Sequence, residues 1–400
     1  MTERPHPTPE PAGALRGLVV LDLSRVRAGP ACTRHFADFG AEVIKVESPP
    51  GQAGGDMFDD RDNADFQNLH RNKRSITLNL KHPRGRELFL ALADAADVVV
   101  ENFRPDVKFR LGIDYETLAA RNARIILASV SGFGEDGPYR ERPGFDQVAQ
   151  GMGGLMSVTG PPGEPMRAGA AVADLAAGMN ATIGILTALA ERSRSGRGQW
   201  VQANLLHSQV ALLDFVAARY LRDGRVPGSV GNDHPTLAPS SAYPTADGRV
   251  NVSALSAEIW QRFARALGHE EWIGRPEYAD AAARVRHREA LNAEIAAATR
   301  NLSSDALIAR LNDAGVPCGP IHALDAVFED PQVRHLGVVV PLEHPRLGPQ
   351  RLLGSPVGLS RTPARVGSVA PDIGADTADV LARVGIDADA LARLRADGVV

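Results

Sequence analysis

Short apolar runs alternate with longer amphipathic segments along the first third of the chain. Five runs rich in Val, Ile and Leu have the length of buried strands: 15–24, 41–47, 73–80, 97–103 and 124–134. Residues 31–40 and 83–96 have the spacing of helices, while 48–70 is polar and rich in Gly and Asp, as in a loop. Strand–helix–strand units form parallel sheets with right-handed crossovers. The pattern predicts an α/β fold with a doubly wound, Rossmann-like sheet.

The rest of the chain predicts a second, smaller α/β domain. Residues 170–195 have the pattern of a helix of small residues, 199–206 that of a strand, and 207–224 that of another helix. Composition then shifts to Pro, Gly, Ser and Asp, which indicates a boundary. We therefore expect four parts, which are a disordered tail (1–14), a large domain (15–225), a small domain (226–330) and a return segment completing the large domain (331–400).

Composition excludes several classes of protein. The net charge of −4, with both signs interspersed, gives no reason to expect nucleic acid as a partner. The longest apolar runs are too short to span a bilayer, so no membrane is expected. The two cysteines lie far apart, which fits neither a disulfide framework nor a zinc site and suits the reducing cytoplasm. A cytoplasmic protein without a metal is the prediction.

The turn after the first strand is the first candidate for ligand binding. It carries Arg25 and Arg27 ahead of a helix start, which together suit a phosphate. Basic residues recur at the ends of other expected strands, at Lys73, Arg74, Lys81, Arg104 and Arg110. The glycine fingerprints of dinucleotide and mononucleotide sites are absent from the sequence. We therefore expect a phosphate-bearing ligand that is held by cationic side chains at the carboxyl ends of the strands.

Asp174 is the one acid in the small-residue stretch "AVADLAAGM", residues 171–179. From these residues alone, two interpretations stay open. An acid at the start of a helix is commonly a cap. It can also be a nucleophile whose small neighbours leave room for a substrate.

The chain resembles the family III CoA-transferases, relatives of formyl-CoA and carnitine CoA-transferases. The resemblance rests on "GLVVLDLSRVRAGPACTRHFADFGAEVIKVE", "NKRSITLNLK", "DVVVENFRPDVKFRLGIDYE", "RIILASVSGFGEDGP", "AVADLAAGMNATIGILTALAERSRSGRGQWV" and "APDIGADTADVL", in collinear order. It implies an acyl-CoA:carboxylate CoA-transferase with an interlocked homodimeric fold. It also implies acyl-CoA and a carboxylic acid as substrates and no permanently bound cofactor.

The resemblance also implies site residues. Asp174 matches the family's nucleophile, which forms an acyl–aspartyl anhydride and then an aspartyl-CoA thioester. Nine positions match CoA contacts: Arg27, Ala28, Leu78, Lys81, Asn102, Phe103, Arg104, Arg110 and Leu111. Ser48 stands where relatives carry an arginine. Phe145, Asp146 and His234 are candidate substrate contacts, although Asp146 could be a cap and Arg27 could pair with an acid.

The helix around Asp174 leads to two further expectations. Ala173, Ala176, Ala177 and Gly178 would be small so that a thioester can approach the carboxylate. The amides at the start of the helix would help to offset the negative charge of the oxyanion.

The alternative function is that of the related α-methylacyl-CoA racemases, in which an aspartate and a histidine exchange a proton. This chain has "GFD" where that histidine belongs, so Phe145 argues against racemisation. The segment "GNDHPTLAPSSAYP" lacks the glycine run of the formyl-specific branch. Arg167 and His234 favour a dicarboxylate such as succinate.

Overall fold

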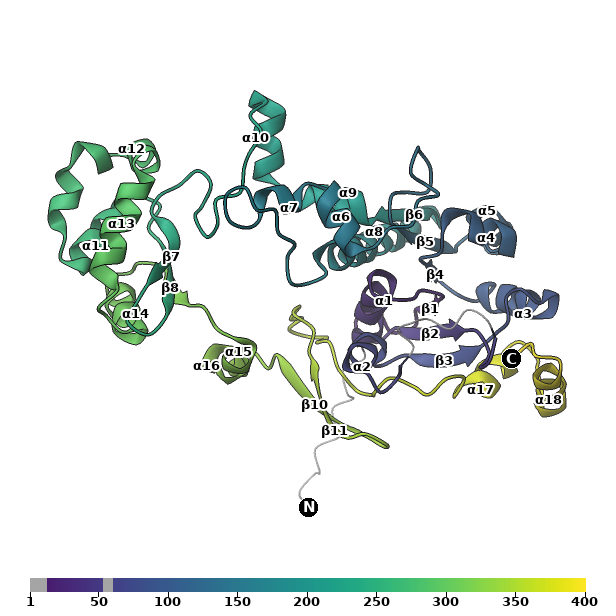
Figure 1. Cartoon of the computed structure of the whole chain (residues 1–400). Coiled ribbons are helices and arrows are strands. Elements are labelled where there is room, and N and C mark those ends of the chain that lie inside the picture. Colours follow the sequence, from purple (N-terminus) through teal and green to yellow (C-terminus); the bar gives the residue numbers. More distant parts are fainter. Residues whose placement is uncertain (1–12, 53–59) are drawn as a thin grey trace, which may run out of the picture. The chain divides into compact units, whose positions relative to one another are not determined.

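The structure is a computed structural model that describes residues 13–52 and 60–400, so most of the expected tail lies outside the described residues. The chain divides into two compact units (Figure 1). Unit 1 comprises the described residues up to Gly154, Gly169–Ala217 and Gln332–Val400, and unit 2 comprises Leu155–Ala168 and Ala218–Pro331. The sequence placed the first boundary at 225/226, and it did not anticipate that 155–168 belong to the second unit.

Unit 1 is built on a parallel six-stranded sheet with the order β3-β2-β1-β4-β5-β6. Its strands are β1 (Val19–Asp22), β2 (Glu42–Glu47), β3 (Arg74–Thr77), β4 (Val98–Glu101), β5 (Ile126–Ser131) and β6 (Trp200–Asn204). This order confirms the predicted doubly wound fold. The direction of winding reverses between β1 and β4, and the carboxyl ends of strands at such a point are where these folds bind ligands.

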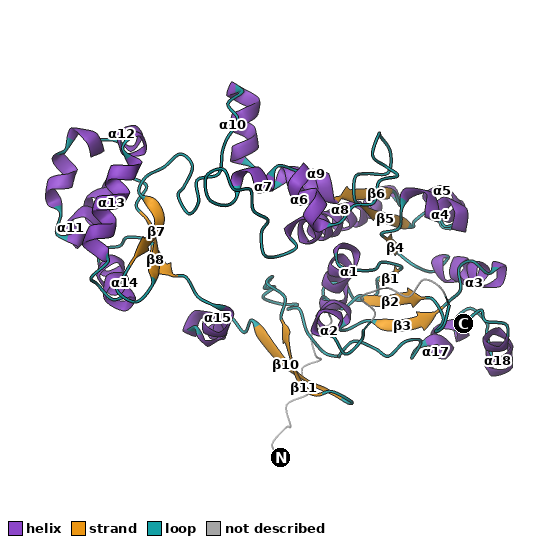
Figure 2. Cartoon of the chain, in the orientation of Figure 1, coloured by secondary structure: helices purple, strands orange, loops and turns teal. Residues whose placement is uncertain are grey.

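Successive side chains of the strands face opposite sides of the sheet, and each side has its own core. Leu21, Ile44 and Val99 pack on one side with α3 (Pro83–Ala93) and α5 (Tyr115–Arg121). Val20, Val43 and Val98 pack on the other side with α1 (Ala28–Asp38) and α8 (Val172–Ser195). Figure 2 shows the strands of this sheet with helices around them. Burial on both sides explains why these strands have continuous apolar sequences.

Two expectations about helices in unit 1 and at its boundary were wrong. The segment 48–70, expected to be a loop, contains α2 (Ala64–His70), whose first turn is capped by the Asn63 side chain. The single helix expected over 207–224 is two helices, α9 (Leu205–Ala211) and α10 (Phe215–Asp223), and α10 spans the boundary with unit 2. Asp214 between them has a φ of 41°, a left-handed conformation that no α-helix continues through. The other helices are α4 (Pro105–Leu111) and α6 (Asp146–Met152).

The C-terminal segment returns to the edge strand β3. The Ser75 amide donates to Asp376 at 2.9 Å, and the Thr77 amide donates to the Thr377 hydroxyl at 3.0 Å. Helices α17 (Thr377–Ala382) and α18 (Ala388–Ala396) follow and lie near β3 and α3 in Figure 1 (yellow). The segment before them contains a hairpin, β10 (Val339–His344) and β11 (Gly348–Leu353), that sequence reasoning missed.

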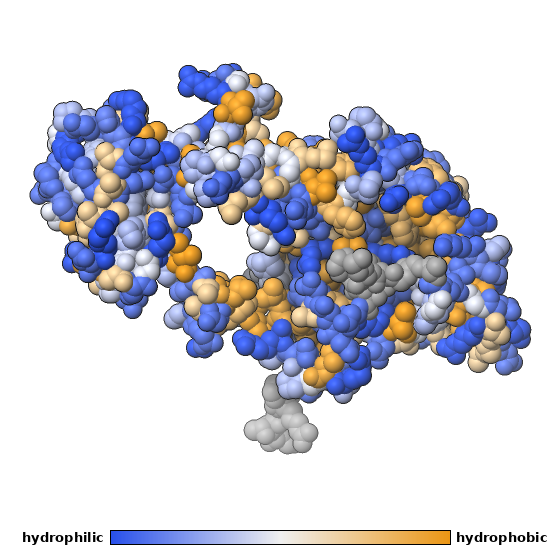
Figure 3. All heavy atoms as spheres, in the orientation of Figure 1, coloured by the Kyte–Doolittle hydropathy of each residue, from blue (hydrophilic) through white to orange (hydrophobic). Residues whose placement is uncertain are grey.

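Unit 2 is a small α/β unit with an antiparallel sheet in the order β7-β8-β9. The strands are Ser240–Pro244, Arg249–Ser253 and Cys318–Pro320, and the helices are α7 (Leu155–Val158), α11 (Ala257–Leu267), α12 (Ala281–Arg286), α13 (Arg288–Thr299), α14 (Ser304–Asp313) and α15 (Leu324–Glu329). α16 (Pro331–His335) spans the boundary with unit 1. Trp260, Phe263 and Trp272 form the centre of its core, with the two indole rings stacked. Hydrophilic residues cover most of the face of this unit that Figure 3 shows.

Helix α8 is the described helix that is long and apolar enough to cross a membrane, by length and composition alone. Its apolar window is 39% buried inside the structure. Ala173, Ala177, Ala181 and Ile185 on that buried side belong to the core between the sheet and α1. This side of α8 is part of the core of unit 1.

Candidate active site

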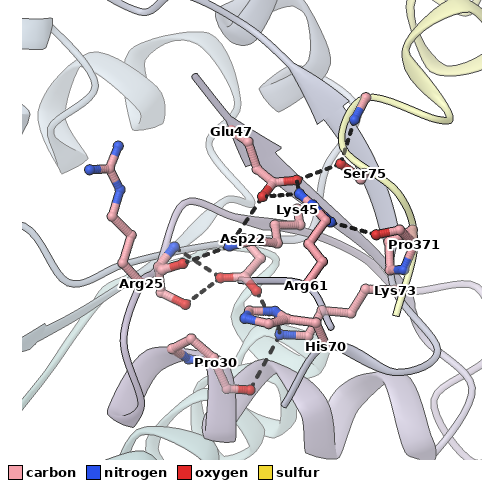
Figure 4. Close-up of polar contacts among 12 residues, drawn as sticks. Asp22, Arg25, Pro30, Lys45, Glu47, Arg61, His70, Lys73, Ser75 and Pro371 are labelled. Atoms are coloured by element: carbon pink, nitrogen blue, oxygen red, sulfur yellow. Dashed lines mark hydrogen bonds and ion pairs between the residues drawn. The ribbon is translucent and has the colours of Figure 1, made fainter. Parts of the chain in front are cut away.

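A buried polar cluster lies beneath the turn that joins β1 to α1 (Figure 4). The Lys73 ammonium lies 2.9 Å from Asp22 and 2.8 Å from the Thr33 hydroxyl, which in turn donates to Asp22 at 2.7 Å. Both charged side chains are 0% exposed. Burial raises the pKa of Asp22, but the ammonium groups of Lys73 and Lys45 outweigh it, and the net pKa is lowered. The buried ion pair therefore ties β1 and α1 to the residue that precedes β3.

The same cluster and its neighbours hold the backbone of the turn. Lys45 donates to the Ser24 carbonyl at 3.3 Å. Asn102, after β4, accepts from the Arg25 amide at 2.8 Å and donates to the Arg25 carbonyl at 2.7 Å. Val26 has a φ of 61°, a conformation that is costly for a β-branched residue. The turn thus stays in a strained conformation because the ends of three strands hold it.

A cavity of about 790 Å³ opens at the carboxyl ends of β1 to β4. Five of the predicted CoA contacts line it: Leu78, Lys81, Phe103, Arg110 and Leu111. Arg25, Arg86, Ser48 and Gln52 line it as well. The cavity therefore combines four cationic side chains with an apolar wall, at the place where the sheet topology predicts a ligand.

The other four predicted CoA contacts have different surroundings. Arg27 forms an ion pair with Asp65 at 2.5 Å, and Asn102 bonds the turn as described. Ala28 packs under α8, and Arg104 is the exposed N-cap residue of α4. The structure does not place these four in the lining of the cavity. Arg86 is the residue that sequence reasoning missed, and its position one turn after Pro83, behind the "LNLK" strand, was the available signal.

Asp174 lies in the first turn of α8, half-buried. Burial and the nearby charge of Asp146 raise its pKa to about 6, and the Arg27 guanidinium opposes them. No residue within 13–52 or 60–400 donates a hydrogen bond to its carboxylate. A carboxylate that is partly desolvated and not hydrogen-bonded is a better nucleophile than a solvated one.

The small residues around Asp174 have a different role from the one expected. Ala173, Ala176, Ala177 and Gly178 are all buried in the packing of α8. A Cβ on Gly178 would lie 2.6 Å from the Ala28 carbonyl oxygen, so glycine allows α8 to touch the start of α1. The expectation that these residues clear space for a thioester was wrong. They bring the turn after β1 against the helix that carries Asp174.

The expected contribution of the helix-start amides was also wrong. The Val172 amide donates to the Ala170 carbonyl, and the Leu175 amide donates to the Ala171 carbonyl. The amides of Ala173 and Asp174 point to the Asp146 carboxylate, at 2.9 and 3.4 Å. The first four amides of α8 are thus engaged within the protein, and none is left for an oxyanion.

Three other candidate residues, Phe145, His234 and Cys32, lie in different surroundings. Phe145 is 63% exposed and directly precedes Asp146, so a phenyl ring stands where the racemase base would be. His234 belongs to unit 2, where burial and then Arg219 and Arg288 lower its pKa. Cys32 is buried, which raises its pKa to about 12 and keeps it a thiol.

Among the described residues, no group of three His, Cys, Asp or Glu side chains is arranged to hold a metal.

Comparison with known proteins identifies the family. The family model for CoA-transferase family III matches residues 15–377. The chain is 38% identical to a succinate–glutarate CoA-transferase of Agrobacterium fabrum, over 96% of this chain and 98% of that protein. It is 36% identical to a succinyl-CoA:mesaconate CoA-transferase of Haloarcula marismortui, over 94% and 97%. A crystal structure of a CaiB/BaiF family protein from Brucella suis covers 93% of this chain, and all of its own, with a TM-score of 0.80 and 36% identity.

The chain therefore belongs to CoA-transferase family III, and it is a CoA-transferase. The predicted family, fold class and reaction class are confirmed.

The raised pKa of Asp174 makes a prediction about stability. An acid whose pKa is about 6 when folded and 3.8 when unfolded destabilises the fold once pH rises above that interval. Asp174→Asn removes this charge, so it should raise the free energy of unfolding at pH 7.5 by about 1–3 kcal/mol. The gain should shrink toward pH 4, where both states hold the proton. Urea unfolding at several pH values measures it.

The exposed Asp136 provides the control, because Asp136→Asn should leave stability nearly unchanged at every pH. An Asp174→Asn variant no more stable than the wild type at pH 7.5 would contradict the raised pKa.

Proposed function

We propose that this protein transfers CoA between dicarboxylic acids, with Asp174 as the nucleophile and the cavity of unit 1 as the CoA site. The observation that carries the proposal is the pairing of two features through one turn. Arg25 of the turn lines the cationic cavity. The positive charge of Arg27, two residues further on, lowers the pKa of the Asp174 carboxyl group. The same turn thus connects the cavity to the proposed nucleophile.

The reaction follows from carboxylate chemistry. The Asp174 carboxylate attacks the thioester carbon of the donor, the C–S bond breaks, and a mixed anhydride and CoA thiolate form. The thiolate then attacks the Asp174 carbonyl carbon of the anhydride, which gives an aspartyl-CoA thioester and releases the donor acid. The acceptor carboxylate attacks that thioester to form a second anhydride. The returning thiolate attacks the acceptor acyl carbon, and free Asp174 is restored.

The cavity suits CoA because the ligand has phosphates at one end and an uncharged arm. Lys81, Arg86 and Arg110 are cations suited to the phosphates, and an arginine can bind phosphate with two hydrogen bonds. Leu78, Phe103 and Leu111 provide apolar contacts for the rest of the ligand. Ser48 lines this cavity at the position where an arginine was expected from the resemblance. Arg86 supplies a positive charge in the same cavity.

The substrate class rests on the relatives. Both CoA-transferases named above act, by their names, on dicarboxylic acids. Arg167 and His234, which the sequence associated with a second carboxylate, both belong to unit 2 and stay predicted contacts. A dicarboxylate acceptor such as glutarate is the inferred class.

The proposed homodimer has one feature of α8 in its favour. Met179, Ile183 and Leu186 form an exposed apolar strip on this helix. Exposed apolar strips of this kind commonly mark contacts with another protein surface.

A cytoplasmic location stays a prediction.

Replacement of the nucleophile tests the reaction. Asp174→Asn should reduce transfer of CoA from succinyl-CoA to glutarate by at least about 10³-fold, because no anhydride can form. Binding of CoA should be unchanged, since Asp174 does not line the cavity. Mass detection of the CoA thioesters measures transfer, and calorimetry measures binding.

Asp136→Asn serves as the control and should transfer normally. Undiminished turnover by Asp174→Asn would refute the nucleophile. Acetate or another monocarboxylate as the preferred acceptor would refute the dicarboxylate assignment.

Replacement of the cavity cations tests the CoA site. Arg86→Ala and Arg110→Ala should each weaken CoA binding by about 10-fold or more, because each removes a charge-assisted contact with a phosphate. Arg84→Ala is the matched control, because Arg84 lies on α3 near Arg86 but faces Glu87 and not the cavity. Equal affinities of all three variants for CoA would show that CoA binds elsewhere.

A further inference from the structure

The start of α8 is capped by a residue from another helix. Ala171, at the N-cap position, has no side chain that can accept a hydrogen bond. Asp146, the first residue of α6, takes that role and accepts the Ala173 amide at 2.9 Å and the Asp174 amide at 3.4 Å. Gln150, one turn further along α6, donates to the other oxygen of Asp146 at 2.6 Å. Asp146 is itself buried, so water does not compete for these bonds.

This cap decides what the Asp174 side chain can do. An aspartate in the first turn of a helix commonly folds back and accepts the helix's own amide protons. Here Asp146 already holds those protons, so the Asp174 carboxylate has no such partner on α8. The lack of hydrogen bonds to that carboxylate among the described residues thus has a physical cause.

Asp146 also puts a second negative charge beside Asp174. The elements packed on α8 include α1, α6, α9 and the strands β5 and β6. The charged groups acting from them on the Asp174 carboxylate are Arg27, which precedes α1, and Asp146 of α6. From α9, the neutral Ser208 hydroxyl bonds Asn180, further along α8. Arg27 is itself held by Asp65, which limits how fully it can neutralise Asp174.

We propose that Asp146 is a positioning residue for CoA transfer, which fixes the first turn of α8 and leaves the Asp174 carboxylate free to attack the thioester. This inference rests on the proposed role of Asp174 as the nucleophile. It replaces the expectation that Asp146 contacts the substrate, because both of its oxygens face protein groups. It also gives the buried acid a reason to stand next to another acid, an arrangement that burial and like charge would otherwise disfavour.

Two substitutions of Asp146 distinguish its role as a hydrogen-bond acceptor at the start of α8 from the effect of its negative charge. Asp146→Asn keeps an oxygen that accepts the amide protons of Ala173 and Asp174, but it removes the negative charge. Asp146→Ala removes both. A purely structural cap predicts that the Asn variant behaves like the wild type, whereas a positioning residue that also acts by its charge predicts a change in the titration of Asp174.

The experiment follows Asp174 directly by carbon-13 NMR of aspartate-labelled protein, with Asp174→Asn used to assign its signal. In Asp146→Asn, the pKa of Asp174 should fall by on the order of one unit, because the like charge is gone. The acid limb of the kcat profile should move down in pH by the same amount, and kcat at pH 8 should fall several-fold with KM for succinyl-CoA unchanged.

Asp146→Ala should lose about 100-fold in kcat while its affinity for CoA stays that of the wild type, because the cavity is untouched. Asp136→Asn, ten residues earlier and exposed, is the matched control for the loss of one acidic side chain. An unchanged Asp174 pKa and pH profile in Asp146→Asn would overturn the proposal, as would full turnover by Asp146→Ala.

The NMR titration requires no turnover, so it remains decisive whatever the reaction. Full activity of Asp174→Asn would refute the proposed nucleophile. The same titration in Asp146→Asn would still show whether Asp146 controls Asp174, and the two failures are therefore distinguishable.

Discussion

The buried ion pair between Asp22 and Lys73 is the constraint on which the site depends. It lies under the turn after β1, where neither side chain reaches water. A buried pair contributes little net stability compared with an apolar pair, but loss of one partner leaves an uncompensated charge and is costly. The strands that bring these residues together are therefore fixed relative to one another. The turn they support can hold Val26 at a φ of 61°. It places Arg25 in the lining of the cavity and Arg27 where its charge lowers the pKa of Asp174.

The contact between α1 and α8 links this fixed turn to the proposed nucleophile, Asp174. Gly178 lets the two helices approach until a side chain no longer fits between them. That approach brings Arg27 near Asp174, while Asp146 holds the start of α8 from α6. The carboxylate thus has a cation on one side and an acid on another, and it has no hydrogen bond from a described residue. Helix packing thus accounts for the environment that we propose makes Asp174 a nucleophile.

Periodicity predicted the sheet well, because the strands of unit 1 are buried on both sides and have continuous apolar sequences. The position of Asp174 at the start of a small-residue helix was also predictable. What local pattern could not supply were contacts between distant segments. The Asp146 cap joins residues 27 positions apart, and Thr377 bonds Thr77 across 300 positions. The roles of Gly178 and of the helix-start amides were misjudged for the same reason, since α1 and α6 decide them. Arg86 escaped notice because an arginine on an amphipathic helix resembles any solvated charge.

The most direct test of the central claim is to capture the bond to Asp174 during turnover. The enzyme is mixed with succinyl-CoA, treated with hydroxylamine, digested and analysed by mass spectrometry. An aspartyl anhydride or thioester reacts with hydroxylamine, so the peptide that contains Asp174 should carry a hydroxamate in the presence of substrate only. An unmodified Asp174 peptide from enzyme that is turning over, or a hydroxamate on another residue, would contradict the assignment.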